Sequence, residues 1–385
     1  MKYLNIEESK LKGQGALETA KEISGQPELW MSIFHKLIAD KKRINDFLGT
    51  TLSQTKKIML TGAGTSAYIG YSVEGCMQRN TGITTVSVAT THLVSHPQDY
   101  FEEDTPTLLV SFARSGDSPE SVAAVRLADE YCKNCFHLII TCNEYGDLAN
   151  YSTKNKSLVF LLPPDSNDKS LAMTGSYTGM LLSALLIGDF KNIENLESTV
   201  QALAEYGNVL LHQKLAKIES IASLPFKRAV FLGSGPQYGT AMESHLKLQE
   251  LTDGAVICKN DSYLGFRHGP KAVVNEETLI VYYFSNNKDV MRYEVDLVNG
   301  MTDGKKPLKQ IGVSAQEINV DSIDDLIVMG SADQKVKVKE EYLTVSSILF
   351  GQLIGFFKSL NLGLQPDSPS TTGAISRIVK GVTIY

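Results

Sequence analysis

"KKIMLTGAGTSAYIGYSVEGCM", residues 56–77, is the stretch from which the fold can be predicted. An apolar, strand-like run leads into a glycine turn at Gly62 and Gly64, and a helix-compatible segment follows the turn. This order of strand, tight turn and helix opens doubly wound sheets, because the turn lets the helix pack back against the strand. The stretch therefore predicts that an α/β domain begins in this part of the chain.

The same pattern restarts at "FKRAVFLGSGPQYGTAMESHLKLQEL", residues 226–251, where Gly233 and Gly235 repeat the spacing of the first turn. Apolar runs and helix-compatible segments alternate after both turns, which indicates mostly parallel sheets covered on both faces. The sequence thus predicts two copies of one α/β unit, joined by helices across residues 174–220. The further predicted strands lie at residues 84–89, 106–112, 136–142, 157–163, 277–284, 306–313 and 325–330.

The length of 385 residues also favours more than one domain, because a single hydrophobic core rarely serves so long a chain. We predict a helical segment at residues 1–44, α/β domains at 45–205 and 215–365, and a C-terminal tail at 366–385.

Composition and charge limit the partners that the protein can have. The net charge of −6 gives no basic footprint for nucleic acid, and no run of eighteen apolar residues predicts a membrane span. Five cysteines do not form a disulfide framework, so we expect reduced thiols and a cytoplasmic protein. A small soluble partner is favoured.

The glycine turn is not a dinucleotide fingerprint, because Ala67 stands where that motif needs its third glycine. The neighbouring hydroxyls of Thr65 and Ser66 instead suggest donors for a phosphate monoester. "SFARSGDSPES", residues 111–121, supplies a second hydroxyl cluster at Ser115 and Ser118. The alternative is that each of these residues only caps a helix.

Glu243, Lys247 and Glu250 are spaced so that a helix presents them on one face. A carboxylate beside an ammonium can act as the base that proton abstraction next to a carbonyl requires. The alternative is a surface ladder of weak ion pairs.

No metal or other cofactor is expected. Cys132, Cys135 and Cys142 lack a fourth ligand at finger-like spacing, and the His92–His96 pair lacks the acid of the zinc-protease motif.

In these motifs the chain resembles the sugar isomerase (SIS) domain family. "GAGTS" and "RSGDSPES" resemble its two sugar-phosphate loops, and the duplication resembles the isomerase half of glucosamine-6-phosphate synthase. The likeness continues through "MESHLKLQEL", "FRHGP" and "VKGVTIY", and the AgaS branch is the most similar in size and motifs. The resemblance implies two tandem doubly wound SIS domains, with an N-terminal helical lead-in and a C-terminal tail that enters the active site.

The resemblance also implies roles for individual residues. Glu250 would move a proton between C1 and C2, Lys247 would line the same site, and His268 would assist ring opening. Lys380, in the terminal "RIVKGVTIY", would form a Schiff base with the ketose. For His268 alone the alternative is a structural histidine, and for Lys380 a solvated tail lysine. The expected substrate contacts are Thr65, Ser66, Arg114, Ser115, Ser118, Thr174 and Glu243.

Two departures affect the second loop, where Ala113 and Arg114 replace a serine and a glutamine of the synthase. Only about fifty residues precede the first domain, so we expect no ammonia-producing glutaminase activity. The resemblance implies conversion of galactosamine 6-phosphate to tagatose 6-phosphate and ammonia in a homodimer. The alternatives are ketose/aldose isomerisation without deamination, and a sugar-phosphate sensor that binds without reacting.

Overall fold

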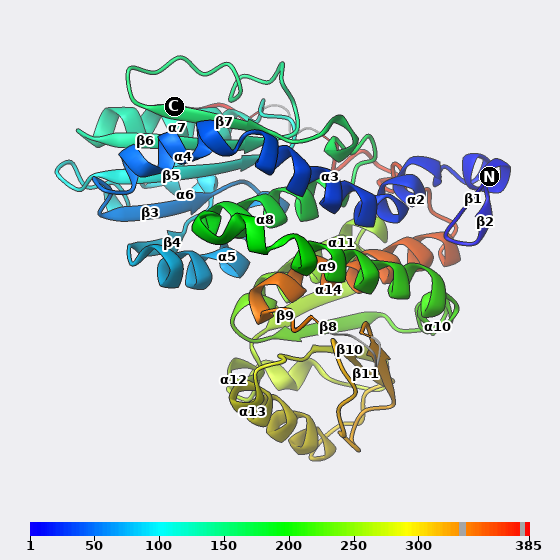
Figure 1. Cartoon of the computed structure of the whole chain (residues 1–385). Helices are drawn as coiled ribbons and strands as arrows, with labels where there is room; N and C mark the ends of the chain where they lie inside the picture. Colours follow the sequence, from blue (N-terminus) through cyan, green and yellow to red (C-terminus); the bar gives the residue numbers. More distant parts are fainter. Residues whose placement is uncertain (331–335, 378–381) are drawn as a thin grey trace. The chain divides into compact units, whose positions relative to one another are not determined.

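The computed structural model describes residues 1–330, 336–377 and 382–385, which form two compact units (Figure 1). The first unit contains Glu28–Asp168, Gly175–Glu197 and the described part of Arg377–Tyr385; the second contains Met1–Pro27, Lys169–Thr174 and the described part of Ser198–Ser376. Each unit is therefore assembled from segments that are far apart in the sequence. The four-part division predicted from the sequence stays a prediction.

The first unit is built on a five-stranded sheet in which every neighbouring pair is parallel. Met59, Leu109 and Ile139 point to one face, where they pack with buried residues of two helices, α6 and α7. The helix α5 packs on the opposite face, at Leu60. The strands, in spatial order, are β4 (Thr84–Ser87), β3 (Lys57–Thr61), β5 (Thr107–Ala113), β6 (Cys135–Thr141) and β7 (Ser157–Leu161). The helices are α3 (Gln26–Ala39), α4 (Lys41–Thr51), α5 (Thr65–Thr81), α6 (Thr90–Ser95), α7 (Pro119–Tyr131) and α8 (Gly175–Gly188).

The second unit repeats this plan with a second five-stranded parallel sheet. One face carries a core around Val230, Ile280 and Tyr282, which packs on two helices, α12 and α13. The strands, in spatial order, are β12 (Asp325–Val328), β11 (Lys309–Ser314), β10 (Thr278–Tyr283), β8 (Arg228–Gly233) and β9 (Ile257–Asp261). The helices are α10 (Leu215–Ala222), α11 (Pro236–Leu251), α12 (Tyr263–Phe266), α13 (Lys288–Asn299) and α14 (Glu340–Asn361).

Both sheets have the same strand order when their strands are counted along the chain: in the first sheet β4-β3-β5-β6-β7, and in the second β9-β8-β10-β11-β12. This is a doubly wound order, and its topological switch point lies between the first and third strands. The switch points are therefore β3/β5 and β8/β10. The predicted fold class is confirmed, and the sheets are wholly rather than mostly parallel. The edge strand β9 was not among the predicted strands.

The remaining elements are short or connect the sheets. They are β1 (Lys2–Tyr3), β2 (Ile6–Glu7), α1 (Glu8–Gly13), α2 (Leu17–Ser24), α9 (Glu197–Asn208), the π-helix Val209–Gln213, and 3-10 helices at Pro97–Asp99, Pro164–Ser166, Phe190–Asn195, Pro270–Val273 and Gly300–Thr302. The first two of these pair as an antiparallel hairpin, which the sequence did not predict.

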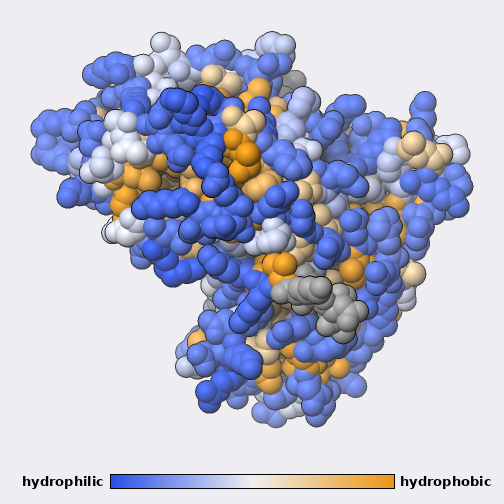
Figure 2. Space-filling model, viewed as in Figure 1, coloured by the Kyte–Doolittle hydropathy of each residue, from blue (hydrophilic) through white to orange (hydrophobic). Residues whose placement is uncertain are grey.

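Among the described residues, α14 has the length and apolar composition that a membrane-crossing helix would need. Of its most apolar 18-residue window, 94% is buried inside the protein. The helix packs against α11 and α10, so it is the core helix of the second unit. The face of the molecule shown in Figure 2 consists mostly of hydrophilic residues, and the apolar residues on it form small separate groups.

Candidate functional site

The first hydroxyl pair lies at the carboxyl end of β3, where the glycine turn leads into α5. A Cβ atom on Gly62 would lie 2.6 Å from the backbone carbon of Ser66, so only glycine fits there. Gly64 has φ 56°, a left-handed conformation that also favours glycine. The turn thus places Thr65 and Ser66 in the first turn of a 17-residue helix. The helix dipole favours an anion at this end.

The second hydroxyl pair follows β5, the strand that pairs directly with β3. At such a switch point the loops after the two strands diverge, and doubly wound proteins bind ligands in the crevice between them. Ser118 occupies the N-cap position of α7, but its side chain makes no capping hydrogen bond. The Ser115 hydroxyl accepts from the Asp117 N–H at 3.2 Å and keeps its own proton for donation. The Ser118 side chain therefore does not cap the helix, which was the alternative to a role in phosphate binding.

A third loop, which follows β6, holds the second one in place. The Asn143 side-chain amide donates to the Ser115 carbonyl at 2.8 Å, and the Leu148 N–H donates to the Gly116 carbonyl at 3.0 Å. Gly146 packs so closely that a Cβ atom there would lie 2.3 Å from the Ser115 carbonyl oxygen. Sequence reasoning missed these supports. The run "CNEYGDL", residues 142–148, offered only the turn residues Asn143 and Gly146 as a signal.

Arg114 starts the second loop, and only 6% of its surface is exposed. Its guanidinium donates to the backbone carbonyl of Arg377 at 2.5 Å. The sequence placed Arg114 among the expected substrate contacts and did not single out Arg377. The structure brings these two residues together within the first unit.

Three predicted residues meet on α11 of the second unit. Lys247 is buried, and its ammonium lies 2.5 Å from Glu250 Oε2 and 3.4 Å from Glu243 Oε1. Glu243 is also fully buried, whereas the Glu250 side chain keeps 24% of its surface exposed. This is not an exposed ladder of ion pairs. It is a buried lysine between two carboxylates, of which Glu250 is the one that solvent can reach.

The remaining predicted residues, His268, Thr174 and Lys380, do not lie on α11. His268 is exposed, and its backbone N–H donates to the Gly265 carbonyl at 3.0 Å just before the Pro270–Val273 turn. Thr174 is buried, and its carbonyl accepts from the Gln352 side chain at 3.4 Å. Lys380 lies outside the described residues.

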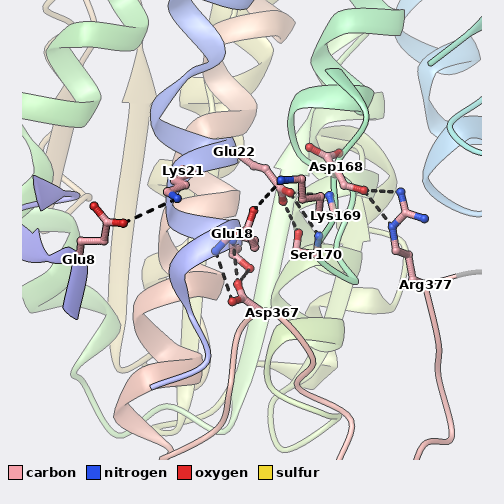
Figure 3. Close-up of polar contacts among 10 residues, drawn as sticks. Glu8, Glu18, Lys21, Glu22, Asp168, Lys169, Ser170, Asp367 and Arg377 are labelled. Carbon is pink, nitrogen blue, oxygen red and sulfur yellow. Dashed lines mark hydrogen bonds and ion pairs between the residues drawn. The ribbon is translucent and has the colours of Figure 1, made fainter. Parts of the chain in front are cut away.

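The tail that leads toward Lys380 is fastened at successive points (Figure 3). Asp367 accepts from the N–H and hydroxyl of Thr19, both at 2.8 Å, and Thr371 donates twice to Asp253 at 3.0 and 2.8 Å. Residues 371–376 are exposed, but Arg377 is half-buried. Its guanidinium donates to the Asp168 carbonyl at 2.9 and 2.5 Å and to Asn167 Oδ1 at 2.9 Å. Arg377 is therefore an anchor point of the tail.

One described group has metal-ligand chemistry, namely Asp129, Cys135 and His137. The Asp129 carboxylate already pairs with His137 and accepts from Tyr151, Thr153 and Asn155 at 2.6–3.0 Å. Burial favours a higher pKa for Asp129, but the hydrogen bonds from His137, Thr153 and Asn155 outweigh it and hold this pKa far below its usual range. The arrangement fits a structural hub that pins residues 151–155, and the absence of a required metal stays a prediction.

The chain resembles known proteins along most of its length. Residues 51–187 match the family described as SIS domain. The D-galactosamine-6-phosphate deaminase AgaS of Shewanella sp. (strain ANA-3) is 38% identical over 376 residues, which cover 96% of this chain and 92% of the relative.

Solved structures agree. One from Clostridium novyi NT superposes with a TM-score of 0.96 at 38% identity and covers 100% of this chain and 99% of that one. Tagatose-6-phosphate ketose/aldose isomerase from Escherichia coli superposes with a TM-score of 0.86 at 34% identity, covering 96% of each chain.

Proposed function

Because the chain belongs to the AgaS family of SIS-domain proteins, we propose that it deaminates and isomerises galactosamine 6-phosphate to tagatose 6-phosphate and ammonia. The observation that carries the proposal is the α11 cluster, in which a buried ammonium contacts a solvent-accessible carboxylate. A protein that only bound sugar phosphate would not need this group. The choice of the galacto sugar comes from the AgaS relatives.

The chemistry needs one proton shuttle. In the open-chain amino aldose, Glu250 takes the proton from C2, and the resulting enolamine receives a proton at C1. The product is a ketimine at C2; water adds to it, and ammonia leaves to give the ketose. Lys247 forms an ion pair with Glu250, and Glu243 offsets the buried lysine charge.

The hydroxyl loops of the first unit suit the 6-phosphate. Thr65, Ser66, Ser115 and Ser118 offer neutral donors at the starts of α5 and α7, so two helix dipoles support the bound anion. Thr174 and Glu243 remain proposed sugar contacts.

Two further parts of the proposal rest on the family resemblance. His268 would open the sugar ring in the site of a partner subunit of a homodimer, and its exposure in the single chain is compatible with that role. Lys380 would form a Schiff base with the ketose. Borohydride reduction with tagatose 6-phosphate should then attach the sugar to Lys380, and Lys380→Ala should escape labelling.

The proposal includes a cytoplasmic location and no cofactor. None of the five cysteines, all of which the structure describes, forms a disulfide, and four of them are buried, as expected for thiols kept reduced.

Ketose/aldose isomerisation without deamination is the second candidate, favoured by the likeness to the tagatose-6-phosphate ketose/aldose isomerase of Escherichia coli. An ammonia-release assay on galactosamine 6-phosphate, glucosamine 6-phosphate and tagatose 6-phosphate separates the candidates. Ammonia from galactosamine 6-phosphate is the expected result. Isomerisation of tagatose 6-phosphate with no ammonia from either amino sugar would favour the second candidate, and binding without any turnover would favour a sensor.

A further inference from the structure

We propose that Arg114 is a positioning residue that clamps the C-terminal segment, rather than a ligand of the substrate phosphate. Its guanidinium donates to the Arg377 carbonyl, although it stands in the loop that carries the phosphate-binding hydroxyls. The catalytic part of this inference rests on the function proposed above.

The clamp has two arms that meet at Arg377. The backbone of Arg377 is held by Arg114, and its side chain is held by the Asp168 carbonyl and the Asn167 side chain. Figure 3 shows the guanidinium of Arg377 directed at Asp168. Both the main chain and the side chain of Arg377 are thus held by hydrogen bonds.

The base of the clamp is rigid. Asp168 is fully buried, and its carboxylate accepts from the N–H groups of Gly175 and Ser176, both at 3.0 Å, at the start of α8. Arg114 is itself buried and follows the central strand β5 directly. Arg377 is therefore tied to two well-packed elements of the first unit.

Because Arg377 is close to Lys380 in the sequence, the clamp bears on the proposed chemistry of that lysine. Arg377 lies three residues before Lys380 and follows the exposed stretch 371–376. A group that reacts with a carbonyl carbon has to be held within about 1 Å of its productive position, and misplacement costs up to about 10²-fold in rate. Losing the clamp should therefore lower kcat, whereas losing a hydroxyl donor should raise KM.

Limited trypsin digestion tests the clamp without any substrate. Trypsin must draw the Arg377 guanidinium into its own pocket, so cleavage after this residue reports release of the clamp. Arg114→Ala should accelerate that cleavage by about tenfold or more. Asn167→Ala removes one of the three hydrogen bonds to the Arg377 side chain and should accelerate cleavage to a smaller extent. Arg126→Ala, on the exposed surface of α7, should have no effect.

Binding and kinetics complete the test. A hexitol 6-phosphate keeps the phosphate but cannot react, and its Kd, measured by calorimetry, should change by less than about threefold in Arg114→Ala. In the active enzyme kcat should fall by about 10- to 100-fold with KM nearly unchanged. Arg114→Lys keeps the buried charge and replaces the alanine variant if that variant does not fold. It should show the same faster cleavage after Arg377 and the same fall in kcat, both to a smaller extent.

A tenfold or larger loss of hexitol 6-phosphate affinity in Arg114→Ala would overturn the inference, because Arg114 would then bind the phosphate. Unchanged cleavage would overturn it as well. If no hexosamine 6-phosphate is turned over, the proposed function fails, but digestion and hexitol binding still decide whether Arg114 clamps the segment.

Discussion

The first switch-point turns of the two units have the same backbone conformation but carry different residues. Gly64 and Gly235 have nearly the same conformation, with φ 56° and ψ −127° against φ 51° and ψ −127°. In the first unit the next residues are Thr65 and Ser66, which offer hydroxyls. In the second they are Pro236 and Gln237, and proline has no N–H to donate. Shared geometry therefore does not imply a shared ligand.

The loops after β5 and β10, which form the other half of each switch point, also differ in the groups that they offer to a ligand. In the second unit the carboxylate of Glu294, from α13, accepts from the Ser285 N–H at 2.8 Å, and both residues are fully buried. An internal carboxylate thus holds a loop N–H of the kind that could otherwise bind an anion. Along α7 of the first unit, whose residues are all described, the buried positions hold serine, alanine and valine but no acid. This difference supports the proposal that phosphate binds to the first unit rather than to the second.

The second unit uses its first helix instead. Glu243, Lys247 and Glu250 lie 8, 12 and 15 residues after Gly235, and the residues at the same distances after Gly64 are Ser72, Cys76 and Arg79. In the proposed function the two copies have therefore specialised, the first in anion recognition and the second in acid–base chemistry.

The largest expected effect comes from Glu250→Gln, which keeps the shape of the side chain but removes the base. Turnover should fall by about 10²- to 10⁴-fold while substrate still binds. Steady-state kinetics with calorimetric binding measures both. Arg79→Gln, at the matching position of the first unit, is the control and should leave kcat unchanged. Equal losses in the two variants would end the idea that the copies have specialised.

Glu294→Gln tests, through the free energy of unfolding, whether the buried Glu294 holds the loop that contains Ser285. Burial raises the pKa of Glu294 to about 8, helped by nearby Glu340, although the Ser285 N–H and the Ser234 hydroxyl oppose the shift. The folded state therefore holds a proton that the unfolded state loses above its ordinary pKa near 4.5, so wild-type stability falls as pH rises from about 4.5 to about 8.

Glutamine cannot ionise and still offers an oxygen to the Ser285 N–H. Urea unfolding should show the variant gaining about 3–4 kcal/mol relative to wild type between pH 5 and pH 8. A gain that does not depend on pH would show that Glu294 is not the titrating group.

Ser115→Ala probes the phosphate site of the first unit. KM for the 6-phosphate should rise by about tenfold, because one charge-assisted hydrogen bond is lost, while any turnover of the unphosphorylated sugar should stay the same. Ser234→Ala, in the first turn of the second unit, is a serine control in the other copy and should leave KM unchanged. If both substrates are affected equally, Ser115 does not act on the phosphate.

The smallest signal is expected from mixing two inactive proteins, Glu250→Gln and His268→Ala. If His268 serves the site of a partner subunit, random exchange makes half of the dimers mixed, and each mixed dimer has one intact site. Activity should recover to about a quarter of wild type. Exchange proven by native mass spectrometry without any recovery would place His268 and Glu250 in the site of one chain.

The repeated turn made the fold predictable from sequence, because glycine at positive φ and apolar runs leave few alternatives. The strand β9 was missed because its residues, "ICKND", are half-exposed at the sheet edge and lack an apolar run. Edge strands are defined by pairing to a neighbour, here β8, which local sequence does not encode.

The candidate site was predictable where chemistry is local to a motif. Helical spacing alone brought Glu243, Lys247 and Glu250 together, although their burial could not be read from spacing. Arg377 was missed because its partner Arg114 lies far away along the chain, and Glu294 because its partner, the Ser285 N–H, belongs to the preceding loop. Contacts across 263 residues, as between Arg114 and Arg377, leave no periodic signal.

The interleaving of the two units also affects how the chain is made. Met1–Pro27 is synthesised well before Ser198, where the main segment of its unit begins, and the first unit is completed only by residues from Arg377 onward. At about 5–20 residues per second, the N-terminal segment waits roughly 10 seconds or longer before its packing partners emerge. In a nascent chain that has not yet reached α14, α2 lacks the helix against which it packs, so its apolar residues Ala20 and Ile23 are less well covered until α14 has been synthesised.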